Sequence, residues 1–187
     1  MSRSEHKPGA RRNGSVHVGP LSAVPILVAR CGASHLMTCL PEDMHVETPA
    51  AINPDKHLRL FMHDIAQPVD GCTPPSQDHI VRLIEFTQDW GGHGPMVVHC
   101  WAGISRSTAA AFISLCALNP GTSEMLIAQS LRAASPTAWP NRLMIRLADD
   151  ALSRSGRMVD AIARIGEGSL TGQVLPFSLP ADLAQKS

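Results

Sequence analysis

The sequence predicts one α/β domain whose central, mainly parallel sheet is flanked by helices. The length of 187 residues suits a single domain. Short apolar segments alternate along the chain with longer segments of helical periodicity, which is typical of a layered α/β arrangement. The stretch Met96-Val97-Val98 is apolar at every position, as expected of a strand that is buried on both faces of a parallel sheet.

The first third of the chain predicts an arm, a helix and two strands. Residues 1–18 mix Ser, Arg, Gly, His and Lys without apolar periodicity, so we expect a flexible N-terminal arm. A short helix follows, with Pro25 in its first turn. In the second of the two strands, Leu58, Leu60 and Met62 alternate with other residues. The predicted helix and strands span residues 20–32, 35–40 and 57–65.

The helix that follows a proline-rich loop at 66–75 has one apolar face. Thr73 can cap this helix, and Pro74 suits its first position. Gly91 and Gly92 are expected to end it. The residues at helical spacing that form the apolar face are Ile80, Leu83, Ile84, Thr87 and Trp90.

The C-terminal half of the chain predicts one strand followed by helices. The strand covers 95–99, and the run Thr108–Leu118 after it is apolar all round, so we expect this helix to be buried. Three further helices are predicted at 122–134, 141–154 and 156–165. Residues 168–187 show no period and are expected to form an irregular tail. The predicted domain therefore spans residues 19–167.

Composition and charge argue against several classes of function. Lys plus Arg number 16 and Asp plus Glu also number 16, so no global field attracts nucleic acid or an anionic membrane. The longest uncharged apolar runs are about eleven residues, too short to span a bilayer. No secretory cleavage site is clear, so we expect a cytoplasmic protein. The five cysteines are scattered and include no C-x-x-C pair, so we expect no disulfide framework, no metal and no cofactor.

The stretch from His99 to Ser107 lies between the predicted buried strand and the buried helix. Parallel sheets bind ligands at the C-terminal ends of their strands, and a short loop that leads into a helix directs several N–H groups at one point. Gly103 permits a sharp bend there. These N–H groups favour a thiolate at Cys100, and the planar guanidinium of Arg106 can bind two phosphate oxygens. The stretch therefore predicts a phosphate-binding loop that carries a nucleophile.

This C-x5-R-S pattern, preceded by His99, resembles the signature of the protein tyrosine phosphatase superfamily, in particular its compact dual-specificity members. The resemblance implies a cysteinyl-phosphate intermediate on Cys100, no metal, and Arg106 as the phosphate-binding arginine. We expect His99 to orient the loop and the Ser107 hydroxyl to bond to the sulfur and assist its departure. The expected phosphate-binding positions are Trp101, Ala102, Gly103, Ile104, Ser105 and Arg106.

The resemblance also implies an aspartate general acid on a loop upstream of the cysteine, and two aspartates compete for this role. Asp64 directly ends the predicted strand, and Leu60-Phe61-Met62-His63-Asp64 matches the strand-to-loop pattern of the family. Asp70 lies in the same loop and is nearer in sequence to Cys100. We favour Asp64. Asn141 falls where related enzymes often carry a polar residue that braces the phosphate loop.

The expected substrate is a phosphorylated protein, with phosphotyrosine preferred over phosphoserine and phosphothreonine. The five spacers between Cys100 and Arg106 are uncharged, whereas a pocket for a multiply phosphorylated inositol needs additional cations. Trp101 and Ile104 offer apolar surface to an aromatic ring, although Trp101 could equally belong to the core. Two alternatives stay open, a rhodanese-like sulfurtransferase and a non-catalytic pseudophosphatase that binds phosphoproteins. The spacing disfavours the first, and the intact Cys100, Arg106 and Ser107 disfavour the second.

Overall fold

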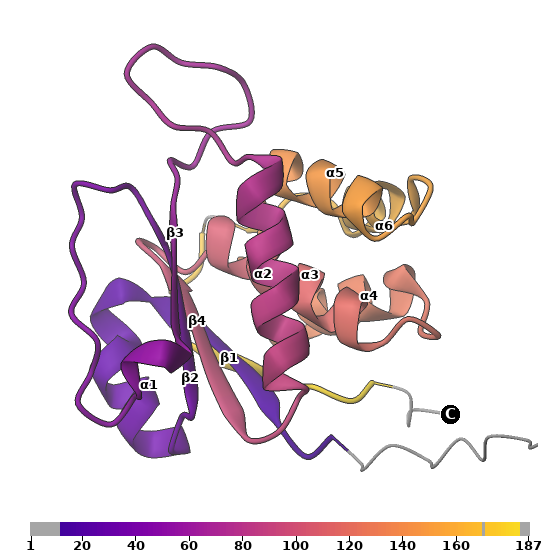
Figure 1. The fold of residues 1–187 in the computed structure, drawn as a ribbon. Coiled ribbons are helices and arrows are strands. Elements are labelled where there is room, and N and C mark those ends of the chain that lie inside the picture. The colour runs from indigo at the N-terminus through magenta and orange to yellow at the C-terminus, as the bar shows by residue number, and fades with distance from the viewer. Residues whose placement is uncertain (1–11, 170, 184–187) are drawn as a thin grey trace, which may run out of the picture.

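The fold is a five-stranded sheet between two helical layers, seen in a computed structural model that describes residues 12–169 and 171–183 (Figure 1). The strand order is β3-β2-β4-β1-β5. All neighbouring strands are parallel except β5, which runs antiparallel to β1. The strands are β1 (Ser15–Pro20), β2 (His35–Leu40), β3 (His57–Phe61), β4 (Pro95–Cys100) and β5 (Phe177–Pro180). The predicted α/β class with a mainly parallel sheet is confirmed.

One helix covers one face of the sheet, and five cover the other face (Figure 1). Helix α1 (Val24–Cys31) lies alone, preceded by the 3-10 turn η1 (Leu21–Ala23); a second 3-10 turn, η2 (Pro54–Lys56), leads into β3. The other layer contains α2 (Gln77–Trp90), α3 (Arg106–Leu118), α4 (Glu124–Ala134), α5 (Arg142–Ala151) and α6 (Arg157–Ile165). Within the described residues, no helix combines the length and apolar character needed to cross a bilayer.

Strand β4 divides its side chains between the two helical layers because successive residues of a strand point to opposite faces. Val97 packs with Val24 and Val28 of α1. Met96 and Val98 join the larger core beneath the other layer. Every residue of α3 except Ala117 is buried, as its unbroken apolar run predicts. The strand and the helix that flank the candidate loop are therefore both held in the interior.

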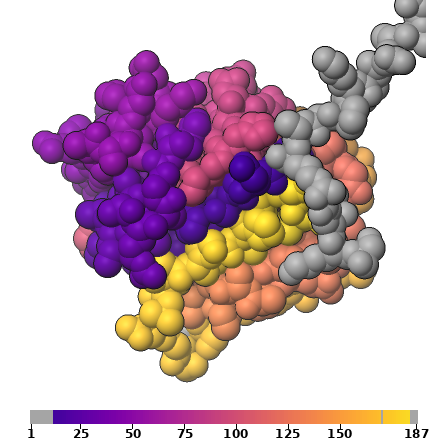
Figure 2. All heavy atoms as spheres, turned by 90° about the horizontal axis from the view of Figure 1, so that it is seen from below, coloured from indigo at the N-terminus to yellow at the C-terminus, as the bar shows by residue number. Residues whose placement is uncertain are grey.

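Two predictions about the chain ends are wrong. The expected arm at 1–18 contains the start of β1, which pairs with β4 in the centre of the sheet. The expected irregular tail at 168–187 contains β5, which extends the sheet beyond β1 (Figure 2). In β1, only Val16 and Val18 carry the apolar pattern, and both are fully buried. Two alternating residues are too short a signal to predict a strand. Residues 1–11, 170 and 184–187 of these segments lie outside the described residues.

Helix α2 starts three residues later than the predicted cap would place it. Ser76 caps the helix, and its hydroxyl and the His79 side chain each bond to the backbone of the other residue. Gly91 ends the helix in the left-handed conformation, at φ 64°. Thr73 instead pairs with His63 in the preceding loop. The five residues of the predicted apolar face are all buried.

Candidate active site

The candidate phosphate loop is the connection between β4 and α3. Cys100 is the last residue of β4, and Arg106 is the first residue of α3. The four strands that surround or flank this connection end at the same edge of the sheet because they run parallel. The structure therefore places the predicted positions 101–105 in one short turn at the C-terminal edge of the sheet, with Arg106 directly after them at the start of α3.

Three carbonyl oxygens of this loop are bonded to groups outside it. The Trp101 carbonyl accepts from the Leu21 N–H at 3.1 Å, and the Ile104 carbonyl accepts from the Trp139 N–H at 2.9 Å. The Ser105 carbonyl accepts from the Ala109 N–H and from the Thr108 hydroxyl. In a trans peptide the C=O and the following N–H point in opposite directions. Outward carbonyls therefore leave N–H groups directed into the turn, where they can bind an anion.

Gly103 lets the loop lie directly against the end of β1. Its φ is +75°, in the region that residues with a side chain rarely adopt. A Cβ at this position would lie 2.7 Å from the backbone carbon of Gly19 and 2.7 Å from the nitrogen of Pro20. Glycine is therefore required at this position, because the positive φ disfavours a side chain and the end of β1 leaves no room for a Cβ.

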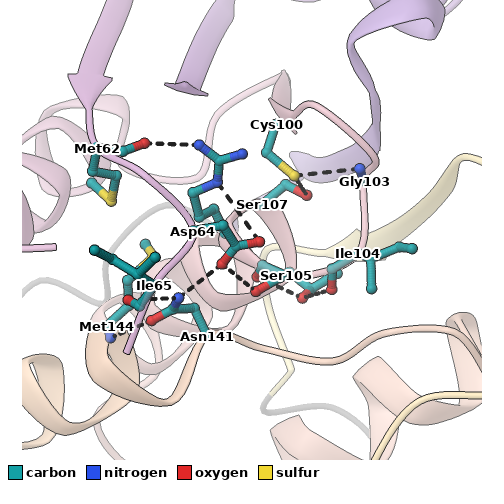
Figure 3. Close-up of polar contacts among 12 residues, drawn as sticks. Met62, Asp64, Ile65, Cys100, Gly103, Ile104, Ser105, Ser107, Asn141 and Met144 are labelled. Carbon is teal, nitrogen blue, oxygen red and sulfur yellow. Dashed lines mark hydrogen bonds and ion pairs between the residues drawn. The ribbon is translucent and has the colours of Figure 1, made fainter. Parts of the chain in front are cut away.

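Two hydrogen bonds hold the sulfur of Cys100. The Gly103 N–H donates to Sγ at 3.3 Å, and the Ser107 hydroxyl lies 3.2 Å from Sγ (Figure 3). A thiolate accepts but cannot donate, so the hydroxyl is the donor when the sulfur is ionised. The side chain is 2% exposed, which restricts access to a group that enters through the loop. This arrangement stabilises negative charge on the sulfur.

Arg106 is buried but incompletely bonded. Its Nη1 donates to the Met62 carbonyl at 2.7 Å, which fixes the guanidinium at the end of β3. Its Nε is buried and has no hydrogen-bond partner among the described residues. A buried donor without an acceptor is costly. A phosphate oxygen would supply the missing acceptor, so the residue fits the role predicted for it.

The carboxylate of Asp64 contacts the candidate loop directly. Its Oδ1 accepts from the Ser105 hydroxyl at 2.7 Å and from the Asn141 side-chain amide at 2.8 Å. Its Oδ2 lies 3.9 Å from Nε of Arg106 (Figure 3). Two donors thus occupy Oδ1, whereas Oδ2 faces the guanidinium of Arg106. The aspartate that the sequence favours as the acid thus stands beside Arg106.

The loop between β3 and α2, which contains the competing Asp70, projects beyond the sheet (Figure 1). This loop is closed at its base by two hydrogen bonds between His63 and Thr73. Asp64 follows that base immediately, whereas Asp70 is exposed and forms no hydrogen bond or ion pair with any described residue. The structure therefore brings Asp64, and not Asp70, into contact with the loop 101–106.

Asn141 connects the candidate acid to helix α5. Its Oδ1 caps the helix by accepting from the N–H groups of Leu143 and Met144, both at 3.1 Å. Its Nδ2 donates to Asp64 and also reaches the Ile65 carbonyl. The residue was expected to brace the phosphate loop. The structure shows a contact with the loop through the backbone N–H, which bonds to the Ser105 carbonyl at 3.4 Å, whereas the side-chain amide holds the Asp64 carboxylate.

The remaining predicted residues have different environments. His99 is fully buried, and its Nδ1 lies 3.4 Å from the Cys100 carbonyl. Trp101 is 59% exposed, so it belongs to the surface beside the loop and not to the core. Ile104 lines a pocket of about 310 Å³ next to the loop, together with Trp139, Arg142 and Asp64. In residues 12–169 and 171–183, no group of three metal-ligating side chains is gathered.

Sequence reasoning missed the groups that hold the loop from outside. These groups are backbone atoms, so no residue type in the sequence indicates their role. They are the N–H groups of Leu21 and Trp139 and the carbonyl of Met62. Thr38, which bonds to His99 at 2.7 Å, was also missed. Its only sequence signal is a polar residue between apolar neighbours in a strand, which is a weak signal.

Comparison with protein families agrees with this geometry. A model of the family described as protein-tyrosine phosphatase matches residues 44–134. The matched segment begins before β3 and ends with α4, so it contains the candidate loop and Asp64. No curated protein matches the chain at a significant level.

Several solved structures have the same fold. DUSP15 has a TM-score of 0.58 and 19% sequence identity, covering 82% of this chain and 95% of its own. The human tyrosine phosphatase-like serine/threonine/tyrosine-interacting protein has a TM-score of 0.57 and 16% identity, covering 78% and 99%. PTPMT1 in complex with PI(5)P has a TM-score of 0.54 and 17% identity, covering 80% and 93%. At these identities the likeness concerns the fold alone.

Replacing Gly103 with Ala should destabilise the protein and disrupt the loop. The left-handed conformation alone costs about 1–2 kcal/mol for a residue with a side chain, and contact with the end of β1 adds to this. Thermal unfolding should show a melting temperature lowered by at least several degrees. Gly121→Ala is the matched control because nothing lies within 4 Å of a Cβ there. Equal melting temperatures for the two variants would contradict the described packing.

Proposed function

Because the chain belongs to the protein-tyrosine phosphatase family, we propose that it hydrolyses phosphoric monoesters through a covalent cysteinyl-phosphate intermediate. The proposal rests on one observation above all. The nucleophilic sulfur of Cys100 receives two hydrogen bonds inside a turn that also contains Arg106, whose buried Nε lacks an acceptor. A phosphate in that turn would meet both the nucleophile and the unsatisfied donor.

In the first step, the thiolate of Cys100 forms a bond to phosphorus while the bond from phosphorus to the ester oxygen breaks. Arg106 and the inward N–H groups of the loop bind the other phosphate oxygens, whose charge is largest in the transition state. Asp64 donates the proton from Oδ2 to the departing oxygen, which leaves as an alcohol or phenol. Transfer of this proton is needed most when the leaving group is a poor one.

In the second step, water attacks the phosphorus of the cysteinyl phosphate, and the bond from sulfur to phosphorus breaks. The Asp64 carboxylate now accepts a proton from the water, the reverse of its first role. The Ser107 hydroxyl, 3.2 Å from the sulfur, donates to the thiolate as it forms. Inorganic phosphate leaves, and the enzyme returns to its starting protonation state.

We propose a phosphorylated protein as substrate, with phosphotyrosine preferred. The pocket beside the loop has apolar walls formed in part by Ile104 and Trp139, and Trp101 exposes a large aromatic surface next to the nucleophile. These surfaces suit the ring of a phosphotyrosine. The loop itself carries no lysine that would bind further phosphates of an inositol ring.

A second candidate is binding of phosphoproteins without turnover. The observation that favours it is the likeness in fold to the human tyrosine phosphatase-like serine/threonine/tyrosine-interacting protein. Against it, the chain presents the sulfur of Cys100, its donors and the acid Asp64 together. The sulfurtransferase alternative loses its support, since the family and the fold are those of phosphatases.

Turnover of an aryl phosphate, measured by phosphate release, tests the proposal. Cys100→Ser should abolish turnover because a serine hydroxyl at this position does not ionise near neutral pH. The variant should remain folded and bind a phosphotyrosine peptide, since the loop and Arg106 are unchanged. A wild-type protein that binds this peptide without releasing phosphate would favour the second candidate, and turnover by the serine variant would contradict the cysteinyl-phosphate intermediate.

Asp64→Asn should lower kcat by about 10²–10⁴, the usual contribution of general acid catalysis. The loss should be largest for alkyl phosphates and smallest for nitrophenyl phosphate, because a good leaving group needs little protonation. Asp70→Asn is the matched control and should retain wild-type kcat on both. If only the substitution at Asp70 gives the leaving-group dependence, the projecting loop must fold over the site and the two roles must be exchanged.

The values of kcat/KM should rank phosphotyrosine peptide first, phosphothreonine peptide second and phosphoinositide last. The aromatic ring gains contact with the apolar surfaces, whereas extra phosphates meet no cation within the loop. Phosphoinositides belong in this comparison because PTPMT1, a neighbour in fold, was solved with PI(5)P. A phosphoinositide in first place would overturn the proposed substrate class, and equal rates on the two peptides would remove the preference for tyrosine.

A further inference from the structure

A line of polar side chains, half-buried at one end and buried from His57 onward, runs across β3, β2 and β4 and ends at Cys100. Thr38 in the middle of β2 places its hydroxyl between two imidazoles, 2.7 Å from Nε2 of His99 and 2.8 Å from Nε2 of His57. The other nitrogen of His57 lies 2.9 Å from the Thr48 hydroxyl, which in turn accepts from Arg59 at 2.7 Å. The polar chain thus consists of Arg59, Thr48, His57, Thr38, His99 and the carbonyl of Cys100.

Register explains why these groups meet. Thr38 is paired with His99 on β4 and with Arg59 on β3, so one residue of β2 faces both neighbouring strands. The three residues at the middle of the chain are shielded from solvent: Thr38 is 2% exposed, His57 7% and His99 0%. Polar groups that are this deeply buried need hydrogen-bond partners, and these three side chains bond to one another.

The donor and acceptor chemistry of each group fixes one direction for all the hydrogen bonds in this polar chain. The Cys100 carbonyl can only accept, so Nδ1 of His99 carries the proton that faces it. In a neutral ring Nε2 of His99 is then an acceptor, which takes the one hydrogen of the Thr38 hydroxyl. Thr38 must therefore accept from Nε2 of His57, and Nδ1 of His57 accepts from Thr48. Thr48 finally accepts from Arg59, which can only donate.

Both rings are neutral under ordinary conditions, as this direction requires. Burial is the main cause that lowers the pKa of His57 to about 4, with the nearby charges of Arg59 and His99 adding to it. Burial likewise lowers the pKa of His99 to about 4, partly opposed by its bond to the Cys100 carbonyl. The proton positions are consequently fixed from one end of the chain to the other.

We propose that Thr38 is a positioning residue for the reaction. Its hydroxyl bonds to Nε2 of His99 and so keeps Nδ1 of that ring directed at the carbonyl of the first peptide of the phosphate loop. That peptide joins Cys100 to Trp101. Holding its carbonyl on His99 turns the Trp101 N–H in the opposite direction, toward the anion. Without the Thr38 hydroxyl, His99 loses its donor at Nε2, and the peptide that carries the nucleophile is less restrained.

The test compares Thr38→Val with Thr38→Ser and rests on the proposed function only in part. Valine keeps the shape of threonine and removes the hydroxyl, whereas serine keeps the hydroxyl. Thr87→Val is the control for stability, since Thr87 is fully buried and bonds to Ser114 in the interface of α2 and α3. Two rates are measured: kcat and KM on an aryl phosphate, and alkylation of Cys100 by iodoacetate, which needs the thiolate and the anion site but no turnover.

Thr38→Val should lower kcat about tenfold, the effect of one hydrogen bond, with a smaller change in KM. Alkylation should slow in parallel. Thr38→Ser should restore both rates, and Thr87→Val should leave both unchanged at a similar melting temperature. Wild-type rates in Thr38→Val, or equal losses in the valine and serine variants, would overturn the proposal. If the wild-type protein shows no turnover, the proposed function fails, and the alkylation rates alone decide the role of Thr38.

Discussion

A loop that binds an anion must keep its own carbonyl oxygens away from that anion, and this constraint organises the rest of the structure. Backbone carbonyls are as numerous as N–H groups, so a turn is suited to phosphate only if each carbonyl has a partner on its outer side. Here the partners come from η1, from the segment before α5 and from the first turn of α3. The elements around the loop therefore do more than cover the core, because they hold the Trp101, Ile104 and Ser105 carbonyls on its outer side.

The same constraint explains how the charged residues are arranged. Arg106 is buried, and its one strong bond is to a backbone carbonyl at the end of β3. Asp64 stands 3.9 Å from it, near enough to balance the charge but not in a close ion pair. A tight pair would compete with phosphate for the guanidinium. Ser105 and Asn141 hold the carboxylate on its other oxygen and so keep it at this distance.

The features of the site that depend on residue type can be predicted from the sequence. The features that depend on backbone atoms or on short strands cannot. Met96-Val97-Val98 and the run Thr108–Leu118 are long and uniform enough to identify the buried strand and helix, and the nine residues between them identify the loop. Its place at a strand end favours Asp64 over Asp70, and the structure also brings Asp64 into contact with the loop. The strands β1 and β5 gave no signal because four to six residues on an edge or at a chain end carry too few alternating apolar positions. The donors from Leu21 and Trp139 could not be found, since any residue except proline has an N–H.

The position of β1 makes both ends of the chain part of the support for the site. Gly103 rests on Gly19 and Pro20 at the end of β1, and β1 itself is held between β4 and β5. A fragment trimmed to 19–167, the boundaries suggested by composition, would lose most of β1 and all of β5 while keeping every predicted site residue. Such a fragment would contain the complete signature, but the end of β1 against which the loop packs would no longer be held in the sheet. The useful boundaries for expression and for engineering are therefore those of the sheet, which extend well beyond the signature in both directions.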